Sequence, residues 1–408
     1  MDATGARLRC VFVHRYFHPD ESVTSQLLTD LCVHLAGSGA EVHVVTSRQM
    51  IDRPDAALPR REVWNGIHIH RLNTTRFGRM DLRGRAIDYL SFYAAAAWRL
   101  AFVVRRGDIV IAKTDPPLVS IVARWVCRVR GARLVNWLQD LFPEVAERLG
   151  VRIAGGRLGR WMKAARDRSL HAAAANVVLG ERMAAQVRSL VPGARVTVIH
   201  NWSDGARIVP TAPPDNPLRR AWGLDARFVV AYSGNMGRAH EFDTILEACG
   251  ALASDDVTFL FIGSGKQRAA LEAAVAREGW RHVRFQPYQP REALAFSLSV
   301  ADVHLVTLKP ALEGLMVPSK FYGIAAAGRP TVFVGDTRGE IAAIVTEAGC
   351  GVAVASGDAA ALVHAIRRLR HDPAAAALMG ARARAVFEAR FDRPDALRRW
   401  ADLLRSCA

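Results

Sequence analysis

The sequence predicts an α/β protein with two doubly wound parallel sheets, and three observations support this. Short runs rich in β-branched and aromatic residues alternate with longer helical patterns along the whole chain. Four prolines fall within residues 208–218, a composition typical of an interdomain connection. The 408 residues, 50% of them hydrophobic, are too many for one ordinary domain and can bury two cores. Disorder, collagen and a small disulfide scaffold are thereby excluded.

The first domain is expected to span residues 1–207. Between its first two strands, residues 25–39 carry apolar side chains at helical spacing and close in glycines, which predicts an amphipathic helix. The predicted strands are 8–14, 41–46, 67–72, 108–112, 133–138, 176–179 and 195–200.

The second domain is expected to span residues 223–390, after a linker at 208–222. A final helix at 391–408 is a candidate to pack back on the first domain. Doubly wound folds bind ligands beyond the carboxyl ends of their strands, so we expect both domains to present these ends to a shared cleft. The predicted strands are 227–234, 257–263, 282–285, 301–308 and 329–334.

The formal net charge of +16 calls for a polyanionic partner or an anionic surface. Only five of the 55 basic residues are lysine, so part of this charge reflects a general abundance of arginine. The six cysteines are spaced too widely for a metal site or a disulfide framework, which favours a reducing cytoplasm. The apolar run after Arg9 is too short for a signal peptide.

Residues 87–104 form the most membrane-like segment, but Asp88 and Arg99 interrupt it, and a spanning helix needs roughly 20 apolar residues. One interpretation is a buried helix. The other is attachment to a membrane surface, because basic residues on both sides of an aromatic-rich helix attract anionic lipid. The arginines around Trp161 similarly suggest a solvated or membrane-facing helix side. The basic flanks of 87–104 are Arg76, Arg79, Arg83, Arg85, Arg105 and Arg106.

Neither common phosphate motif is present at residues 262–268. A dinucleotide fingerprint starting at Gly263 would need glycine where Arg268 stands. A P-loop ending at Lys266 would need glycine at Leu260 and a hydroxyl residue at Gln267. What remains is a glycine turn between a strand and a helix. Either the turn only connects the two elements, or it lets backbone amides approach a phosphate or nucleoside.

Two further segments of the second domain have the composition of an anion site. Residues 232–248 end a strand in glycines and open a helix, with Arg238 and His240 in the loop, which suits a pyrophosphate or is a solvated connector. In residues 308–345, Lys320 is a candidate phosphate ligand and Glu313 a candidate acceptor for sugar hydroxyls. Either charge standing alone would indicate a solvated surface loop.

Through these motifs the chain resembles the retaining, nucleotide-sugar-dependent glycosyltransferases of family 4, which have the GT-B fold of two Rossmann-like domains facing across a cleft. The resemblance covers nearly the whole sequence. It points to the branch that builds bacterial exopolysaccharide, colanic-acid-type or O-antigen repeat units. The runs that carry it are residues 19–46, 137–144, 199–204, 233–248, 261–265, 313–330 and 339–345.

The resemblance implies transfer of a sugar from a nucleotide-sugar donor, with retention, to a polyprenyl-diphosphate-linked saccharide. No metal or further cofactor is expected, since the nucleotide sugar is a substrate. Nothing in the sequence resembles a groove-reading helix or an aromatic stacking sheet, so no nucleic acid is expected. The implied location is cytoplasmic, peripheral on the inner face of the cytoplasmic membrane.

The resemblance also implies roles for individual residues. Those expected to act in catalysis are Glu313, Asp140, Lys320 and Arg238. Those expected to bind the donor are Gly234, Asn235, Gly237, His240, Gly263, Gly265, Gly314, Leu315, Met316 and Glu340. Those expected on the acceptor side are Ser22, Thr24, Ser25, Gln139 and Glu144.

The chain departs from the family pattern at several positions. The second carboxylate of the motif would fall at Phe321 or, measured from the following small-residue run, at Gly323. Asn235 and His240 stand where many relatives have Arg and Lys, and Gln139 stands where a His is common. Two alternatives therefore stay open, a GT-B nucleotide-sugar epimerase and a catalytically degenerate, membrane-associated scaffold that binds donor, and donor turnover would separate the scaffold from an enzyme.

Overall fold

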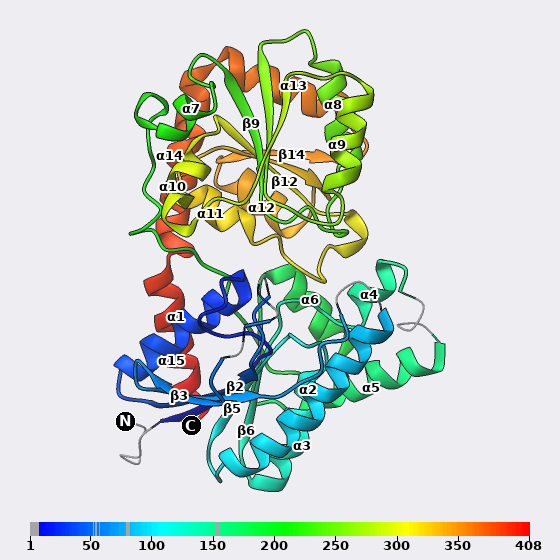
Figure 1. The fold of residues 1–408 in the computed structure, drawn as a ribbon, viewed down its shortest axis with the longest axis vertical. Helices are drawn as coiled ribbons and strands as arrows, with labels where there is room; N and C mark the ends of the chain where they lie inside the picture. Colours follow the sequence, from blue (N-terminus) through cyan, green and yellow to red (C-terminus); the bar gives the residue numbers. More distant parts are fainter. Residues whose placement is uncertain (1–7, 52, 54, 57, 79–81, 152–155) are drawn as a thin grey trace. The chain divides into compact units, whose positions relative to one another are not determined.

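The computed structural model describes residues 8–408 except 52, 54, 57, 79–81 and 152–155. The chain divides into two compact units, the first made of Met1–His200 with Leu397–Ala408 and the second of Asn201–Ala396. Each unit is a sheet covered by helices (Figure 1), so the predicted α/β class with two sheets is confirmed. The predicted linker at 208–222 lies within the second unit, where it forms η2 (Pro213–Asp215) and α7 (Pro217–Ala221).

The sheet of the first unit has the order β3-β4-β2-β1-β5-β6-β7-β8 and is parallel except for β3, which pairs antiparallel with β4. The sequence prediction missed β3, a short edge strand with alternately exposed side chains. Asn65 and Gly66, both at positive φ, form the tight turn that joins it to β4, and this pair was the available signal. The strands are β1 (Arg9–Val13), β2 (Glu41–Ser47), β3 (Arg61–Trp64), β4 (Ile67–Leu72), β5 (Ile109–Lys113), β6 (Arg133–Trp137), β7 (Ala175–Val178) and β8 (Val196–Val198).

Helices cover both faces of this sheet. On one face, α2 and α3 pack their apolar side chains against alternate residues of β1 and β5, such as Val11 and Val110. On the other, Trp400 of α15 contacts Trp137, with 4.5 Å between ring centroids. The helices are α1 (Val23–Gly37), α2 (Leu82–Val103), α3 (Val119–Arg130), α4 (Glu144–Arg148), α5 (Gly156–Ala172), α6 (Glu181–Leu190) and α15 (Arg393–Ser406), the last shared with the second unit.

Helix α2 contains the membrane-like segment and is buried on one side only. Phe92, Ala96 and Leu100 are fully buried, whereas Trp98 is 72% and Phe102 65% exposed. The interpretation of a buried helix therefore holds for one face of α2 only. Within the described residues, no helix has the length and apolar character needed to cross a bilayer.

The sheet of the second unit is parallel throughout, in the order β11-β10-β9-β12-β13-β14. Numbered from β9, this order is 3-2-1-4-5-6, that of dinucleotide-binding folds, and it reverses direction between β9 and β12. The prediction missed β14, a short glycine- and alanine-containing strand at the sheet edge. The strands are β9 (Phe228–Ser233), β10 (Val257–Ile262), β11 (Val283–Gln286), β12 (Val303–Thr307), β13 (Thr331–Gly335) and β14 (Gly351–Ala355).

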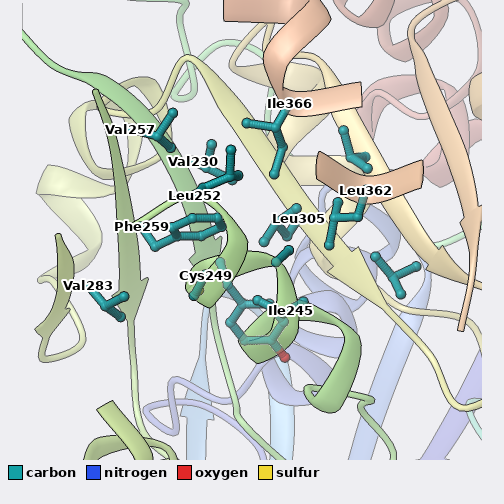
Figure 2. Packing of buried hydrophobic residues seen from close by; sticks show 14 of the residues in the cluster. Val230, Ile245, Cys249, Leu252, Val257, Phe259, Val283, Leu305, Leu362 and Ile366 are labelled. Atoms are coloured by element: carbon teal, nitrogen blue, oxygen red, sulfur yellow. The ribbon is translucent and has the colours of Figure 1, made fainter. Parts of the chain in front are cut away.

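The main core of the second unit lies between this sheet and two of its helices. Figure 2 shows Phe259 and Leu305 of the strands packed near Ile245 of α8 and Leu362 of α13. Since the strands are buried on both faces, they read as nearly continuous apolar runs, which is why the sequence revealed them. The helices are α8 (Asp243–Ala251), α9 (Arg268–Arg277), α10 (Leu294–Ser299), α11 (Lys320–Ala326), α12 (Glu340–Glu347), α13 (Ala359–His371) and α14 (Pro373–Arg390), with 3-10 turns η3 (Arg291–Ala293) and η4 (Pro310–Leu312).

Candidate functional site

The loops that follow β9 and β10 pack backbone against backbone at the carboxyl edge of the second sheet. Gly234, Gly263 and Gly265 have φ angles of +128°, +131° and +144°, a region that favours glycine. A side chain at Gly265 would come within 2.6 Å of the Asn235 amide oxygen. The amide of Met236 donates to the Ser264 carbonyl oxygen at 2.7 Å and joins the two loops. The predicted glycine turns therefore form one close-packed structure.

Lys320, the first residue of α11, reaches this pair of loops. A side chain on Gly234 would come within 2.7 Å of its Cε atom, so glycine leaves the space that the lysine uses. Its Nζ atom lies 2.9 Å from His240 Nε2 and 5.2 Å from the centre of the Tyr232 ring. Burial lowers the pKa of Lys320 to about 7.

His240 orients the lysine and stays neutral. Its Nδ1 lies 2.7 Å from the carbonyl oxygen of Thr307, the last residue of β12, so Nδ1 carries the proton and Nε2 accepts from Lys320. Burial, together with the nearby Lys320 ammonium, lowers the pKa of His240 to about 3. The predicted His240 and Lys320 thus form a hydrogen-bonded pair, and sequence reasoning did not foresee it.

Glu313 lies in the loop that follows β12, directly after η4. Its Oε1 accepts a hydrogen bond of 2.9 Å from the backbone amide of Glu340, the first residue of α12. Burial raises the pKa of Glu313, and the amides of Glu340 and Gly314 partly offset this shift. A side chain on Gly339 would collide with the other carboxylate oxygen. Glu340 therefore contacts this loop through its backbone amide.

The same loop is tied to the glycine loops, because the Lys309 amide donates to the Ala239 carbonyl at 2.9 Å. Gly314 has a φ of +73°, Leu315 is buried and Met316 is half-buried. Asn235 and Arg238 are exposed at the rim, beside the half-buried Gly237.

No carboxylate replaces the second Glu of the family pattern at either expected position. Phe321 is fully buried and packs edge-on against Phe391, with 5.9 Å between ring centroids. A side chain at Gly323 would come within 3.2 Å of Leu298. Both positions thus serve packing.

The predicted acceptor-side residues lie at the carboxyl edge of the first sheet or at the start of α1. Asp140 and Gln139 follow β6, and burial raises the pKa of Asp140 to about 6. Ser22 precedes α1 and donates to Asp20. The Thr24 carbonyl accepts from Lys113 at 2.7 Å, and Ser25 is fully buried.

Glu144 is engaged in a buried ion pair. Its two carboxylate oxygens accept from the Arg166 guanidinium of α5 at 2.7 and 2.9 Å. This bidentate contact holds α4 against α5 and leaves Asp140 as the better placed carboxylate of the segment.

Sequence reasoning missed residues at the point where the first sheet reverses direction, between β1 and β5. Asp115 follows β5, and burial raises its pKa to about 6, with the nearby Asp140 charge adding to the shift and Arg15 opposing it. Arg15 follows β1 and donates its backbone amide to the Asp115 carbonyl at 2.8 Å. The fully buried His14 precedes it, and burial and Lys113 lower its pKa. The strand-end rule that singled out Asp140 would also have found Asp115.

Within the described residues, no three His, Cys, Asp or Glu side chains gather as metal ligands would. All six cysteines are free and buried.

Family models match most of the chain. The model described as "Glycosyl transferase 4-like domain" matches residues 25–202, and that described as "Glycosyl transferases group 1" matches residues 227–372. The first match lies in the first unit apart from its last two residues, and the second lies wholly in the second unit.

Two curated proteins are similar in sequence. The probable glycosyltransferase WbjE of Pseudomonas aeruginosa is 28% identical over 289 residues, which cover 71% of this chain and 72% of WbjE. The putative colanic acid biosynthesis glycosyl transferase WcaI of Escherichia coli is 30% identical over 253 residues, or 60% of this chain and 62% of WcaI.

A solved structure shares the fold. Anabaena HepE in complex with UDP-glucose matches with a TM-score of 0.72 and 18% identity, covering 98% of this chain and 100% of HepE.

Proposed function

We propose that this chain, a glycosyltransferase of the GT-B type, transfers a sugar from a nucleotide-sugar donor, with retention, to a lipid-linked saccharide in bacterial surface polysaccharide synthesis. Two relatives support this proposal, since WcaI is named for colanic acid biosynthesis and HepE was solved with UDP-glucose. The donor is proposed to bind the second unit and the acceptor the first.

The observation that carries the proposal is the Lys320–His240 pair beside the glycine loops. Burial destabilises the charged form of Lys320 and lowers its pKa. An anion bound beside the ammonium group stabilises that charged form, so binding of the anion is favourable. The glycine loops let backbone amides approach the same anion closely. The pair is therefore suited to stabilise the charge that develops on a leaving nucleoside diphosphate.

Glu313 is proposed to hold the donor sugar. Its Oε1 is fixed by the start of α12, so its carboxylate is preorganised to accept hydrogen bonds from sugar hydroxyls and to offset positive charge on an oxocarbenium-like sugar. With Lys320 and the exposed Arg238 providing positive charge for the diphosphate, the reaction is proposed to proceed without a metal ion. Attack by the acceptor hydroxyl from the face of the leaving group then gives retention.

On the acceptor side we propose Asp140 and Asp115. They follow the neighbouring strands β6 and β5, and the Asp140 charge adds to the raised pKa of Asp115. Near neutral pH both are largely ionised and can accept hydrogen bonds from acceptor hydroxyls. Glu144 is less suitable because Arg166 occupies it.

Peripheral attachment to the cytoplasmic face of a membrane completes the proposal. Exposed aromatic residues of α2, such as Trp98 and Phe102, lie between the basic segments that end in Arg85 and begin at Arg105. An aromatic side chain with flanking arginines suits the interface of an anionic bilayer. Of the arginines predicted to take part, Arg79 lies outside the described residues.

The proposal is tested by thermal shift and hydrolysis of UDP-, GDP-, dTDP- and ADP-sugars with purified protein. One donor class is expected to stabilise the protein and to turn over, and Lys320→Ala and Glu313→Ala to abolish both effects. Lys163→Ala, which removes a lysine of the first unit, is the matched control. Absence of stabilisation by every nucleotide sugar, in wild-type protein that is folded, would refute the proposal.

A further inference from the structure

A cavity of about 880 Å³ lies at the edge of the first unit's sheet where β6, β7 and β8 begin. The side chains near the ends of α3 and α15 also line it. In a parallel sheet this edge is opposite the carboxyl edge, where Asp115 and Asp140 lie. None of the proposed donor or acceptor residues lines the cavity, so it is separate from the transfer site.

Four arginines from three segments line this cavity. Arg124 and Arg128 come from α3, Arg133 begins β6, and Arg195 directly precedes β8. No aspartate or glutamate lines the cavity, and no ion pair of these four arginines occurs in the described part of the chain. Arg128, Arg133 and Arg195 are exposed and Arg124 is half-buried, so solvent reaches these side chains. The cavity therefore concentrates positive charge without a counter-charge from its own side chains.

Only part of this charge is offset by the backbone. Arg133 donates to the Cys407 carbonyl oxygen at the end of α15, where the helix dipole is negative. Like charges held near one another repel, so a bound anion would lower the free energy of this arrangement. Thr197 lines the same cavity, and a threonine hydroxyl can donate to an anion, whereas the Ser406 hydroxyl donates to the Leu403 carbonyl oxygen at 2.8 Å.

We propose that this cavity binds a phosphate-bearing anion. Planar guanidinium groups match phosphate oxygens through paired hydrogen bonds, and several of them suit a group with more than one negative charge. The volume lies within the range of small-molecule sites, so a whole phosphorylated compound fits, not only an isolated ion.

Such a phosphate can come from a soluble compound or from the headgroup of an anionic lipid. The second source has a structural basis, because α3 exposes Trp125 and Val129 next in sequence to the cavity residues Arg124 and Arg128. The shared chemistry is the phosphate group, and the experiment separates the two sources.

The test measures binding of inorganic pyrophosphate by calorimetry to the full chain carrying Lys320→Ala, which disables the proposed donor site. In this background the result does not depend on the proposed function. Arg128→Gln with Arg195→Gln is expected to weaken binding by about tenfold or more, since each removes a charge-assisted contact. Arg60→Gln with Arg148→Gln removes the same charge from exposed positions of the first unit and is expected to leave affinity unchanged.

Binding that is equally strong in the cavity variant and in the control variant, or no binding to either, would overturn the proposal. Thermal unfolding of both variants confirms that they fold. Vesicles of phosphatidylcholine with and without phosphatidic acid then identify the source. Loss of vesicle binding in the cavity variant alone, with competition by pyrophosphate, assigns the site to a lipid headgroup; unchanged vesicle binding assigns it to a soluble anion.

Discussion

Lys320 shows how the surroundings of a residue change its chemical properties, since burial lowers its pKa to about 7. As one of five lysines it was notable in the sequence, but the sequence did not show that Gly234 leaves room for it or that neutral His240 accepts a hydrogen bond from it. Glu313 was likewise identifiable from its loop, whereas its hydrogen bond from the start of α12 was not. Both residues could be singled out as candidates from local sequence patterns. Their hydrogen bonds could not be predicted, because they join residues 27 and 80 positions apart.

The depressed pKa of Lys320 predicts how donor affinity depends on pH. The free protein loses the proton of Lys320 above about pH 7, whereas the diphosphate of a bound donor holds the proton on. Binding above pH 7 must therefore take up a proton, and affinity is expected to fall by about tenfold per pH unit there and to be nearly constant below. Calorimetry with the nucleotide sugar that binds, from about pH 6 to about pH 9, measures this dependence. Lys320→Arg stays charged and is expected to flatten the curve; a wild-type affinity that is constant over this range would contradict the assignment.

Gly339 provides a test of Glu313 that leaves the carboxylate in place. Gly339 has a φ of −72°, which alanine adopts freely, but its Cβ would collide with Glu313 Oε2. Gly339→Ala is expected to lower kcat by about 10-fold to 100-fold, because a displaced catalytic group loses its alignment. Glu313→Gln, which keeps the hydrogen bond from Glu340, is expected to cost about 100-fold. Gly37→Ala, at a glycine with open space around it, is the control. Full activity of Gly339→Ala would show that the position of Glu313 is unimportant.

At the scale of elements, the strands with two buried faces were the most predictable feature. Every strand proposed from an apolar run is present, with bounds that differ by at most two residues. The prediction missed β3 and β14, which lie at sheet edges and are too short or too exposed to stand out. Helix α2 shows the opposite error, since a single apolar run concealed two faces with different environments. Burial is decided by neighbouring elements, which local periodicity does not report.

Helix α2 predicts a measurable affinity for anionic vesicles. Reversing Arg76, Arg79, Arg83 and Arg85 to glutamate is expected to weaken binding by about 100-fold or more, because each basic residue near such a surface contributes about 1 kcal/mol. Trp98→Ser with Phe102→Ser is expected to weaken it through lost apolar contact. Vesicle sedimentation measures both effects. The control reverses exposed arginines of the second unit, Arg220, Arg277 and Arg281. Unchanged vesicle binding in both α2 variants, with donor binding intact, would remove α2 from the membrane surface.

At the scale of the whole molecule, two separate cores allow the two units to carry separate tasks. From the proline-rich segment the sequence predicted two domains with a boundary at 208–222, whereas the structure divides the chain after His200. The prediction that ligands bind at the carboxyl edges of the sheets stays a prediction. The sequence could not give the strand order, since hydrogen-bonded neighbours such as β9 and β12 are about 70 residues apart. Because β9 and β12 are parallel neighbours, His240, which follows β9, and Glu313, which follows β12, lie at the same edge of the sheet.

This division predicts where a donor protects the backbone. A nucleotide sugar bound at the carboxyl edge of the second sheet shields the loops that it contacts and stabilises only the state in which they are folded, so their amides exchange more slowly. Hydrogen exchange with the donor present is expected to slow at least about tenfold in segments 233–240, 263–268 and 312–320, where roughly 1.4 kcal/mol of stabilisation suffices. Peptides from the carboxyl edge of the first sheet, including Asp115 and Asp140, are expected to keep their rates until an acceptor is added. Lys320→Ala is the control, and it is expected to abolish the protection in the second unit because it removes donor binding. Protection confined to the first-unit peptides would reverse the assignment of donor and acceptor.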